Sequence, residues 1–169
     1  MVHTGNNFAL SYGDKIVGNA NAHDNASVNY NGGNRFKAAL IDFGENLFIG
    51  SIPQALLGLG IVFPFITTAY QGWIGGIVSV DNLHASRLIK TKSALYYLIV
   101  LILQFIPYSL TIGAGLNLGI NTYILNKGRN ISEFRFDKTS LKDVFTIYLF
   151  AAPIFFIASC FEFLSNWNI

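Results

Sequence analysis

Few side chains in this sequence are equipped for chemistry, and the most informative of them stand inside apolar segments. Glu162 is the only carboxylate in a likely membrane span, directly after the last uncharged segment, and Gln104 and Asn117 are amides within another. Polar groups in apolar surroundings either bond to a neighbouring helix or line the path of a polar solute. We therefore select Gln104, Asn117 and Glu162 as candidate intramembrane polar residues, with both roles open. Because Glu162 lies near the end of its segment, contact with the membrane interface is a third interpretation.

No motif typical of an enzyme occurs in the sequence. It lacks the Gly-x-Ser-x-Gly, phosphate-loop and His-Glu-x-x-His patterns. The single cysteine, Cys160, excludes an internal disulfide and a multi-cysteine metal site, and it stands in an apolar run. His84 lies in a basic segment, where solvation is the expected state and ligation of a pigment or haem is the alternative. We expect a non-catalytic protein with no cofactor and no metal.

The composition indicates a protein that lipid surrounds. Charged residues make up 12% of the chain and hydrophobic residues 52%, with a mean hydropathy of +0.44. Soluble domains carry about 25% charged residues, so this chain has too few to cover a surface in water. The net charge of +2 and the absence of a basic stripe argue against nucleic-acid binding. The expected partners are lipid and other integral membrane proteins, including a second copy of the chain.

Three long segments contain no Asp, Glu, Lys or Arg. They cover residues 46–80, 93–126 and 144–161, which are 35, 34 and 18 residues long. About 20 apolar residues cross a bilayer core of about 30 Å, so the first two are too long for one upright helix. Pro64 and Pro107 stand near the places where these two would break. We predict an all-α membrane protein, a helical bundle with broken or hairpin transmembrane helices and about five passes or half-passes. Three long tilted helices are the alternative.

Basic residues predict the orientation of these helices. They cluster before the first segment, between the first two, and between the last two, and this type of clustering favours the cytoplasmic side. If all three clusters are cytoplasmic, the chain forms two hairpins and a final single span, with the C-terminus outside.

Two regions follow from this pattern. Residues 1–45 form a polar N-terminal segment without a visible signal peptide, and residues 46–169 form a transmembrane helical domain. Within the first region, residues 8–17 and 35–43 are expected to be short amphipathic helices. They either lie on the membrane surface or simply lead into the first span. Residues 18–34, rich in Asn and Gly, are expected to form a loop.

Glycine pairs, helix caps and aromatic residues give further expectations about how the helices pack, begin and meet the membrane interface. Gly72 and Gly76, like Gly115 and Gly119, are spaced four apart, which lets another helix approach closely. The approaching helix belongs either to this bundle or to a partner protein. Ser140 to Asp143 resembles a capping box, and Ser93 is expected to cap the helix that begins after it. Aromatic residues near the ends of the apolar segments, Trp167 among them, are expected to anchor the chain at the interface.

Several short elements occur in a recognisable order along the chain. They are Ser11-Tyr12-Gly13-Asp14; Asn46 at the start of the first span; Gln71-Gly72 with Gly75; Phe105-Ile106-Pro107-Tyr108 before a glycine-rich stretch; and Ala158 to Glu162. Over residues 8–163 this order resembles the stage II sporulation protein M family of integral membrane proteins. Gln71 replaces an Asn of the family pattern, Ile106 replaces a Leu, and a Glu common after the proline element is replaced near Thr111.

The resemblance implies a non-catalytic component of the bacterial cytoplasmic (inner) membrane. Sporulating members of that family act with cell-wall hydrolases during engulfment, and relatives occur in bacteria that form no spores. Our first functional hypothesis is therefore a membrane scaffold or accessory subunit that packs against other membrane proteins. The alternative is a transporter or permease-like subunit that moves a small solute between its broken helices.

Overall fold

The computed structural model describes residues 1–80 and 83–165, and this part of the chain is helical apart from loops and one isolated bridge between Val80 and Ser86. The N-terminal helices are η1 (Val2–Thr4), α1 (Asn7–His23), α2 (Asn25–Asn31) and α3 (Arg35–Gly44). A π-helix, η2 (Glu45–Ser51), then leads into α4 (Ile52–Leu57), η3 (Gly58–Gly60) and α5 (Phe63–Ile77). The last elements are α6 (Thr91–Asn126), η4 (Ile131–Glu133) and α7 (Lys138–Leu164). The all-α class is confirmed. The expected anchor Trp167 lies outside the described residues.

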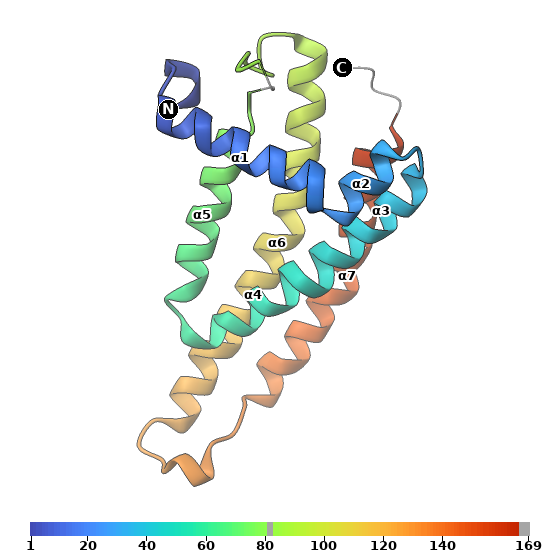
Figure 1. Cartoon of the computed structure of the whole chain (residues 1–169). Coiled ribbons are helices and arrows are strands. Elements are labelled where there is room, and N and C mark those ends of the chain that lie inside the picture. Colours follow the sequence, from blue (N-terminus) through green and yellow to red (C-terminus); the bar gives the residue numbers. More distant parts are fainter. Residues whose placement is uncertain (81–82, 166–169) are drawn as a thin grey trace.

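The first apolar segment folds into a helical hairpin. One arm runs from α3 through η2 into α4, and α5 returns antiparallel to it (Figure 1). The turn lies between them, where Ile61 has φ +53°, a left-handed value that is costly for a β-branched residue. Pro64 stands in the first turn of α5, where its missing N–H is not needed by the helix. The chain therefore reverses a few residues before Pro64.

The second apolar segment does not break, and the prediction of a break at Pro107 is wrong. α6 is one helix of 36 residues with Pro107 inside it, which makes it about 54 Å long at about 1.5 Å per residue. A proline removes a single backbone donor, and apolar helices tolerate this where neighbouring segments pack against the site. Here the Pro107 ring is fully buried among its neighbours, which is the setting in which such a helix continues.

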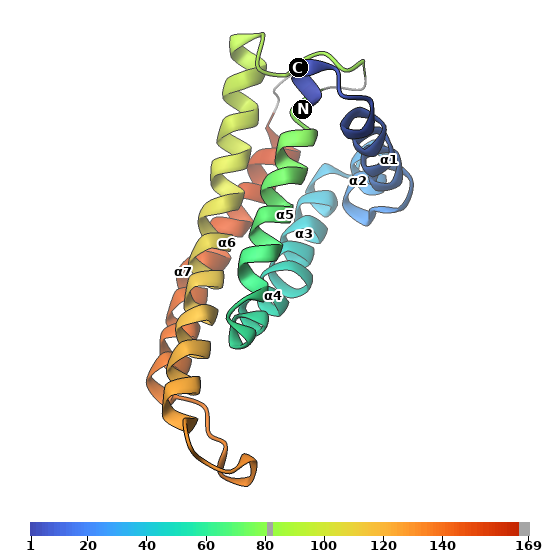
Figure 2. The same ribbon diagram turned by 90° about the vertical axis from the view of Figure 1, so that its left-hand side faces the viewer.

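Four helical arms thus lie side by side. α6 and α7 pack against each other as a long antiparallel pair, and the α4–α5 turn reaches only part of the way along them (Figures 1 and 2). The loop between α6 and α7 extends beyond that turn, at the end opposite α1. The basic segments around residues 87–92 and 127–142 therefore lie at opposite ends of the bundle. The arrangement of two hairpins followed by a single span is wrong, because α6 is continuous.

Only α6 and α7 among the described helices are long and apolar enough to cross a membrane. In their most apolar windows, 11% and 22% of the residues are buried inside the bundle, whereas the core helix of a soluble protein is mostly buried. On α6 an exposed stripe recurs at helical spacing, formed by Leu95, Leu98, Ile102, Ile106 and Leu110. Such a stripe is typical of a helix that faces an apolar environment.

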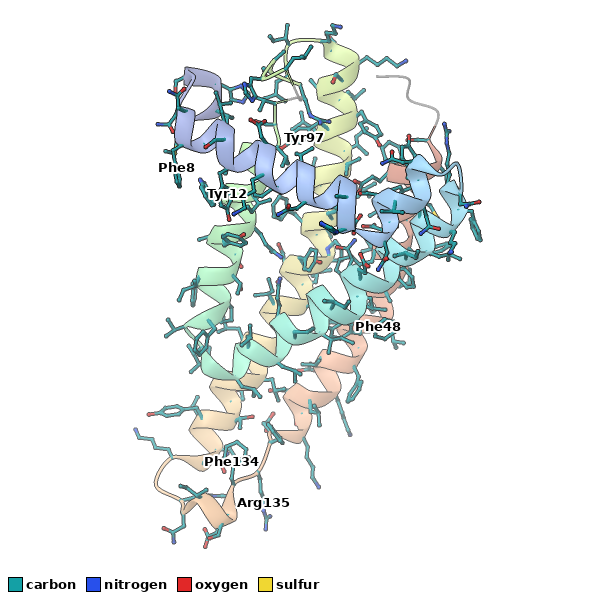
Figure 3. The ribbon with its side chains drawn as sticks, viewed as in Figure 1. Phe8, Tyr12, Phe48, Tyr97, Phe134 and Arg135 are labelled. Atoms are coloured by element: carbon teal, nitrogen blue, oxygen red, sulfur yellow. The ribbon has the colours of Figure 1, made fainter. Side chains whose placement is uncertain are left out.

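The N-terminal region is more helical than the sequence predicted. α1 extends to His23 and α2 follows it directly, so the loop expected at residues 18–34 is largely wrong. α1 lies across one end of the bundle, and Phe8 on it is exposed (Figures 1 and 3). α3 continues into the π-helix, so the boundary expected at residue 45 falls inside a continuous helical stretch.

Both predicted helix caps are wrong. α7 begins at Lys138, and its cap is Asp137, whose Oδ2 accepts from the Ser140 amide at 2.7 Å. α6 begins at Thr91, two residues before Ser93. In both cases the expected cap is a buried residue within the first turn of the helix. The Ser140 hydroxyl accepts hydrogen bonds from Asn117 and Asn121 of α6, and Ser93 borders a cavity beside α6.

Candidate functional site

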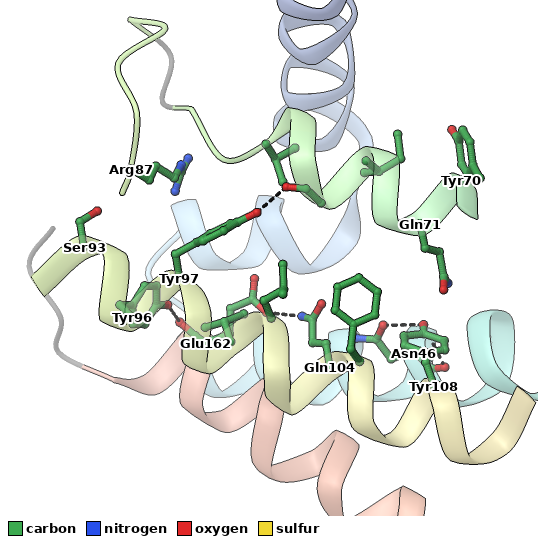
Figure 4. Close-up of a pocket in the computed structure, with 16 residues that line it drawn as sticks. Asn46, Tyr70, Gln71, Arg87, Ser93, Tyr96, Tyr97, Gln104, Tyr108 and Glu162 are labelled. Atoms are coloured by element: carbon green, nitrogen blue, oxygen red, sulfur yellow. Dashed lines mark hydrogen bonds between the residues drawn. The ribbon is translucent and has the colours of Figure 1, made fainter. Parts of the chain in front are cut away.

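A cavity of about 530 Å³ lies between α5, α6, the end of α7 and the start of η2 (Figure 4). Its volume falls in the range of about 300–1,000 Å³ that is usual for small-molecule sites. The exposed wall is mainly apolar and aromatic, and ten of the lining residues carry a polar group. Those polar residues are Asn46, Tyr70, Gln71, Arg87, Ser93, Tyr96, Tyr97, Gln104, Tyr108 and Glu162.

The carboxylate of Glu162 occupies one wall of the cavity. Gln104 Nε2 donates a hydrogen bond of 2.6 Å to Glu162 Oε2, which joins α6 to α7. The Tyr96 hydroxyl donates to the backbone carbonyl of Glu162 at 2.8 Å. No Lys or Arg among residues 1–80 and 83–165 pairs with this carboxylate within 4.0 Å. A carboxylate that is held by an amide and lacks a cation is suited to receive a positively charged group.

A positive charge lines the same cavity from the loop before α6. Arg87 is half-buried, and its Nε donates to the carbonyl of Val80 at 3.2 Å. The loop is fastened further by Arg87 N, which donates to Ser79 O at 2.9 Å. Figure 4 shows Arg87 beside Tyr97, on the side away from Gln104. The guanidinium therefore keeps donors for another group.

Tyr97 fixes the distance between α5 and α6 at the level of the cavity. Its hydroxyl donates to the backbone carbonyl of Gly75 (Figure 4). A Cβ at Gly75 would meet Leu101 at 3.5 Å and Phe105 at 3.8 Å, so Gly75 leaves space in the wall. A larger side chain at this position would fill the cavity.

The opposite end of the cavity is closed by Tyr108 and Asn46. The Tyr108 hydroxyl donates to Asn46 Oδ1 at 2.8 Å. Beyond this contact, Ser51 Oγ donates to Thr111 Oγ1 at 2.9 Å, and the Tyr148 hydroxyl lies 3.0 Å from Ser51 Oγ. Hydrogen-bonding groups therefore continue from the cavity into the contact between η2, α6 and α7.

The π-helix explains how one segment supplies both of these contacts. In an α-helix, residues five apart point about 140° away from each other. In η2 the hydrogen bond runs from the Ile52 amide to the Leu47 carbonyl, so residues five apart lie about one turn apart. Asn46 and Ser51 consequently face α6 together. π-Helices occur frequently at functional sites, and this one forms the end wall of the cavity.

The other sequence-selected polar residue, Asn117, lies away from the cavity. Its Nδ2 donates to Ser140 Oγ at 3.4 Å, and Asn121 Nδ2 donates to the same oxygen at 2.8 Å. These bonds tie α6 to the first turn of α7. Nearby, the hydrogen bond from the Ser140 amide lowers the pKa of Asp137 below its ordinary value. Asn117 thus belongs to the α6–α7 junction, while Gln104 and Glu162 come together as a pair.

The two glycine pairs lie in different surroundings. A Cβ at Gly115 would overlap the backbone of Ala55, and one at Gly119 would overlap the backbone of Gly58. This pair therefore packs the hairpin turn against α6. Nothing lies within 4 Å of the corresponding positions at Gly72 and Gly76, so their face of α5 is open.

Metal-ligating residues do not gather in the part of the chain that the structure describes. No group of three or more His, Cys, Asp or Glu residues among those described is arranged to hold a metal. His84, expected to be solvated, is exposed but lies 2.9 Å from Asp14 of α1. Cys160 is a free, half-buried thiol.

Sequence reasoning missed Arg87 and the tyrosines as parts of one site. The basic cluster between the first two uncharged segments contains Arg87 and predicts only orientation. The aromatic residues near the segment ends include Tyr96 and Tyr97 and predict only anchoring at the interface. Their position in the cavity depends on how the loop before α6 folds back, which no local pattern encodes. The one sequence signal for this site is that Tyr96 and Tyr97 follow the basic cluster by about one helical turn.

Comparisons with protein-family models, with curated proteins and with solved structures find no match to this chain. The resemblance to stage II sporulation protein M therefore rests on its sequence elements alone.

Proposed function

We propose that this chain is an integral membrane protein that binds a small solute in the cavity between α5 and α6, as a transporter-like or solute-binding subunit. The observation that carries the proposal is an acid, a guanidinium and several hydroxyl and amide groups converging on one cavity beside the two candidate spans. A scaffold needs no such cavity. Polar groups beside apolar helices are costly and are commonly retained for solute or ion pathways.

The arrangement of helices supports the same proposal. The hairpin formed by η2, α4 and α5 is a broken element packed against two long helices, a device that membrane carriers use to form solute sites. The contacts from Tyr108 to Asn46 and from Ser51 to Thr111 continue the polar groups past the end wall. A solute that leaves the cavity in this direction requires the Tyr108–Asn46 contact to open.

Filling the cavity tests this proposal. The wild-type protein, extracted in mild detergent and then treated with organic solvent, should release a bound small molecule detectable by mass spectrometry. Gly75→Phe should abolish that release, because Gly75 borders the cavity. Gly72→Phe is the matched control, since nothing lies within 4 Å of its side-chain position. Identical release from wild type and Gly75→Phe, with both variants folded, would contradict the proposal.

A second candidate function is supported by the open face of α5. We also propose that Gly72 and Gly76 receive a helix of another membrane protein, as in a scaffold or accessory subunit. Their open surroundings distinguish them from Gly115 and Gly119, which are used inside the bundle. Gly76→Leu should then remove partner proteins that copurify in mild detergent, and should leave the helical content unchanged. Unchanged copurification would exclude this role.

The sequence resemblance supports a non-catalytic component of the bacterial cytoplasmic membrane in both cases. Four of the five family elements contribute residues that border the cavity, namely Asn46, Gln71, Gly75, Tyr108 and Glu162, whereas Ser11 to Asp14 lies on α1. The elements would then mark a solute site rather than a surface.

A further inference from the structure

We infer that the end of the bundle opposite α1 binds acidic phospholipid, with its basic side chains on the lipid phosphates and its aromatic side chains in the hydrated headgroup layer. This surface is residues 127–143, which we call the tip; it joins the end of α6 to the first turns of α7 (Figures 1 and 3). No residue of the tip borders the cavity. The inference shares with the proposed function only the premise that lipid surrounds α6 and α7.

Charge is distributed unevenly along the chain. The tip holds five Lys or Arg and three Asp or Glu, and the rest of the chain holds six of each. The whole net charge of +2 therefore resides at the tip. Its basic residues are all exposed, and none forms an ion pair within 4.0 Å with an acid among residues 1–80 and 83–165. They are Lys127, Arg129, Arg135, Lys138 and Lys142.

The exposed stripe of α6 places the tip at the level of the lipid headgroups. Ile120 and Ile124 are exposed. They follow Ile102 and Ile106 by 18 residues, which is five full turns at about 3.6 residues per turn, so the stripe continues on one side to the end of α6. From Leu95 to Ile124 the stripe is about 44 Å long at about 1.5 Å per residue. A bilayer with its headgroups is about 40–45 Å thick, so the two ends of the stripe reach the two headgroup layers.

Apolar and aromatic side chains are exposed between the cations of the tip. Phe134 and Phe136 are both about half exposed, and Ile131 is 96% exposed. The two rings meet edge to face with their centroids 5.3 Å apart. Asn126 holds this part of the loop, since its Nδ2 donates to Arg135 O at 2.7 Å and its Oδ1 accepts from Arg135 N at 2.9 Å. A surface that mixes aromatic and basic side chains is suited to the headgroup layer.

The charge of the tip favours acidic over neutral phospholipid. Clusters of four to eight Lys or Arg beside a membrane-spanning helix attract acidic lipid, and each such residue near the surface contributes about fivefold in affinity. Arginine also binds phosphate through two parallel N–H donors. Phosphatidylcholine carries a phosphate as well, but its own ammonium group cancels that charge. The tip should therefore discriminate between two lipids that differ in headgroup charge.

Lipid retention tests the inference on the full-length protein. Vesicles of equal phosphatidylglycerol and phosphatidylcholine would be dissolved in mild detergent, and the lipids that stay on the protein would be counted by native mass spectrometry. Wild type should retain phosphatidylglycerol in preference to phosphatidylcholine. The combined substitutions Lys127→Gln, Arg129→Gln and Arg135→Gln should lower that preference about tenfold or more, because three contributions of about fivefold each are removed. A preference equal to that of wild type would overturn the inference.

A matched triple variant controls for net charge. Lys15→Gln, Lys37→Gln and Lys90→Gln remove three charges from exposed positions outside the tip, so this variant should keep the wild-type preference. Equal losses in the two triple variants would show a general effect of charge and would contradict a site at the tip.

Two measurements on the wild-type protein need no variant. Raising the salt concentration from about 0.1 M to about 1 M shortens the screening length from about 10 Å to about 3 Å and should remove most of the preference; a preference that is absent or insensitive to salt would refute the inference. Glycerol phosphate carries an acidic headgroup without acyl chains, and in large excess it should leave the bound lipid in place. Its displacement of the lipid would identify a free phosphate compound as the ligand instead.

Discussion

Substitution of Gly115 by alanine tests how the hairpin is held against α6. An added Cβ would fall within 3.0 Å of three backbone atoms of Ala55, where no side-chain rotation can relieve the overlap. Overpacking of this kind costs about 1–3 kcal/mol, and a rigid backbone neighbour places Gly115→Ala at the upper end. Alanine recovers about 1 kcal/mol of helix propensity. The net loss of unfolding free energy should therefore be about 2 kcal/mol.

Gly76→Ala provides the matched comparison, because it makes the same chemical change where nothing lies within 4 Å. It should leave stability unchanged or raise it by up to about 1 kcal/mol. The assay is equilibrium unfolding in mixed micelles of mild detergent and sodium dodecyl sulfate, followed by circular dichroism. Equal unfolding free energies for the two variants would refute the assignment of Gly115 to internal packing and Gly76 to an open face.

Three further changes probe other parts of the bundle. Tyr148→Phe removes the hydroxyl that lies 3.0 Å from Ser51 Oγ and should lower the unfolding free energy by about 1 kcal/mol. The control is the exposed Tyr123→Phe, which should alter the unfolding free energy by less than about 0.5 kcal/mol. Equal effects of the two variants would argue against the hydrogen bonds among Ser51, Thr111 and Tyr148. Deletion of the exposed Phe48 should convert η2 to an α-helix that places Asn46 and Ser51 four residues apart, so both should still face α6 and the melting temperature should change little; a large fall in melting temperature would contradict the interpretation of the π-turn as one extra residue. The pKa of Asp137 is lowered from 3.8 by the hydrogen bond from the Ser140 amide, so its stabilisation is present above that value and is lost as the pH falls through the lowered folded-state pKa. Asp137→Asn should therefore lose less melting temperature on acidification from about pH 5 to about pH 3 than wild type does, and parallel losses would contradict this sign.

The sequence contained enough information for the helical class and for part of the site. Long uncharged segments predict helices whatever their final packing, and the polar residues within them had to find partners. Glu162 and Gln104 accordingly meet at 2.6 Å. The glycine spacing also indicated close packing, and Gly115 and Gly119 supply it inside the bundle.

The remaining features depend on tertiary structure. A proline in an apolar segment predicts a break, but burial of its ring let α6 continue through Pro107. The π-helix has no local signature, because it arises where Asn46 and Ser51 must both face α6. Arg87 reaches the cavity only because the loop before α6 folds back toward Val80. Each is a consequence of contacts between residues far apart in the sequence.

Cysteine accessibility in membrane vesicles tests the central claim most directly, namely that lipid surrounds the bundle while a polar cavity opens beside α6. In a Cys160→Ala background, single cysteines would replace Ile102 and Ile106 on the exposed stripe, Gln71 in the cavity, and Phe134 in the α6–α7 loop. A small water-soluble thiol reagent should modify the cysteines at Gln71 and Phe134 and spare those on the stripe. Equal modification of all four positions would contradict the account.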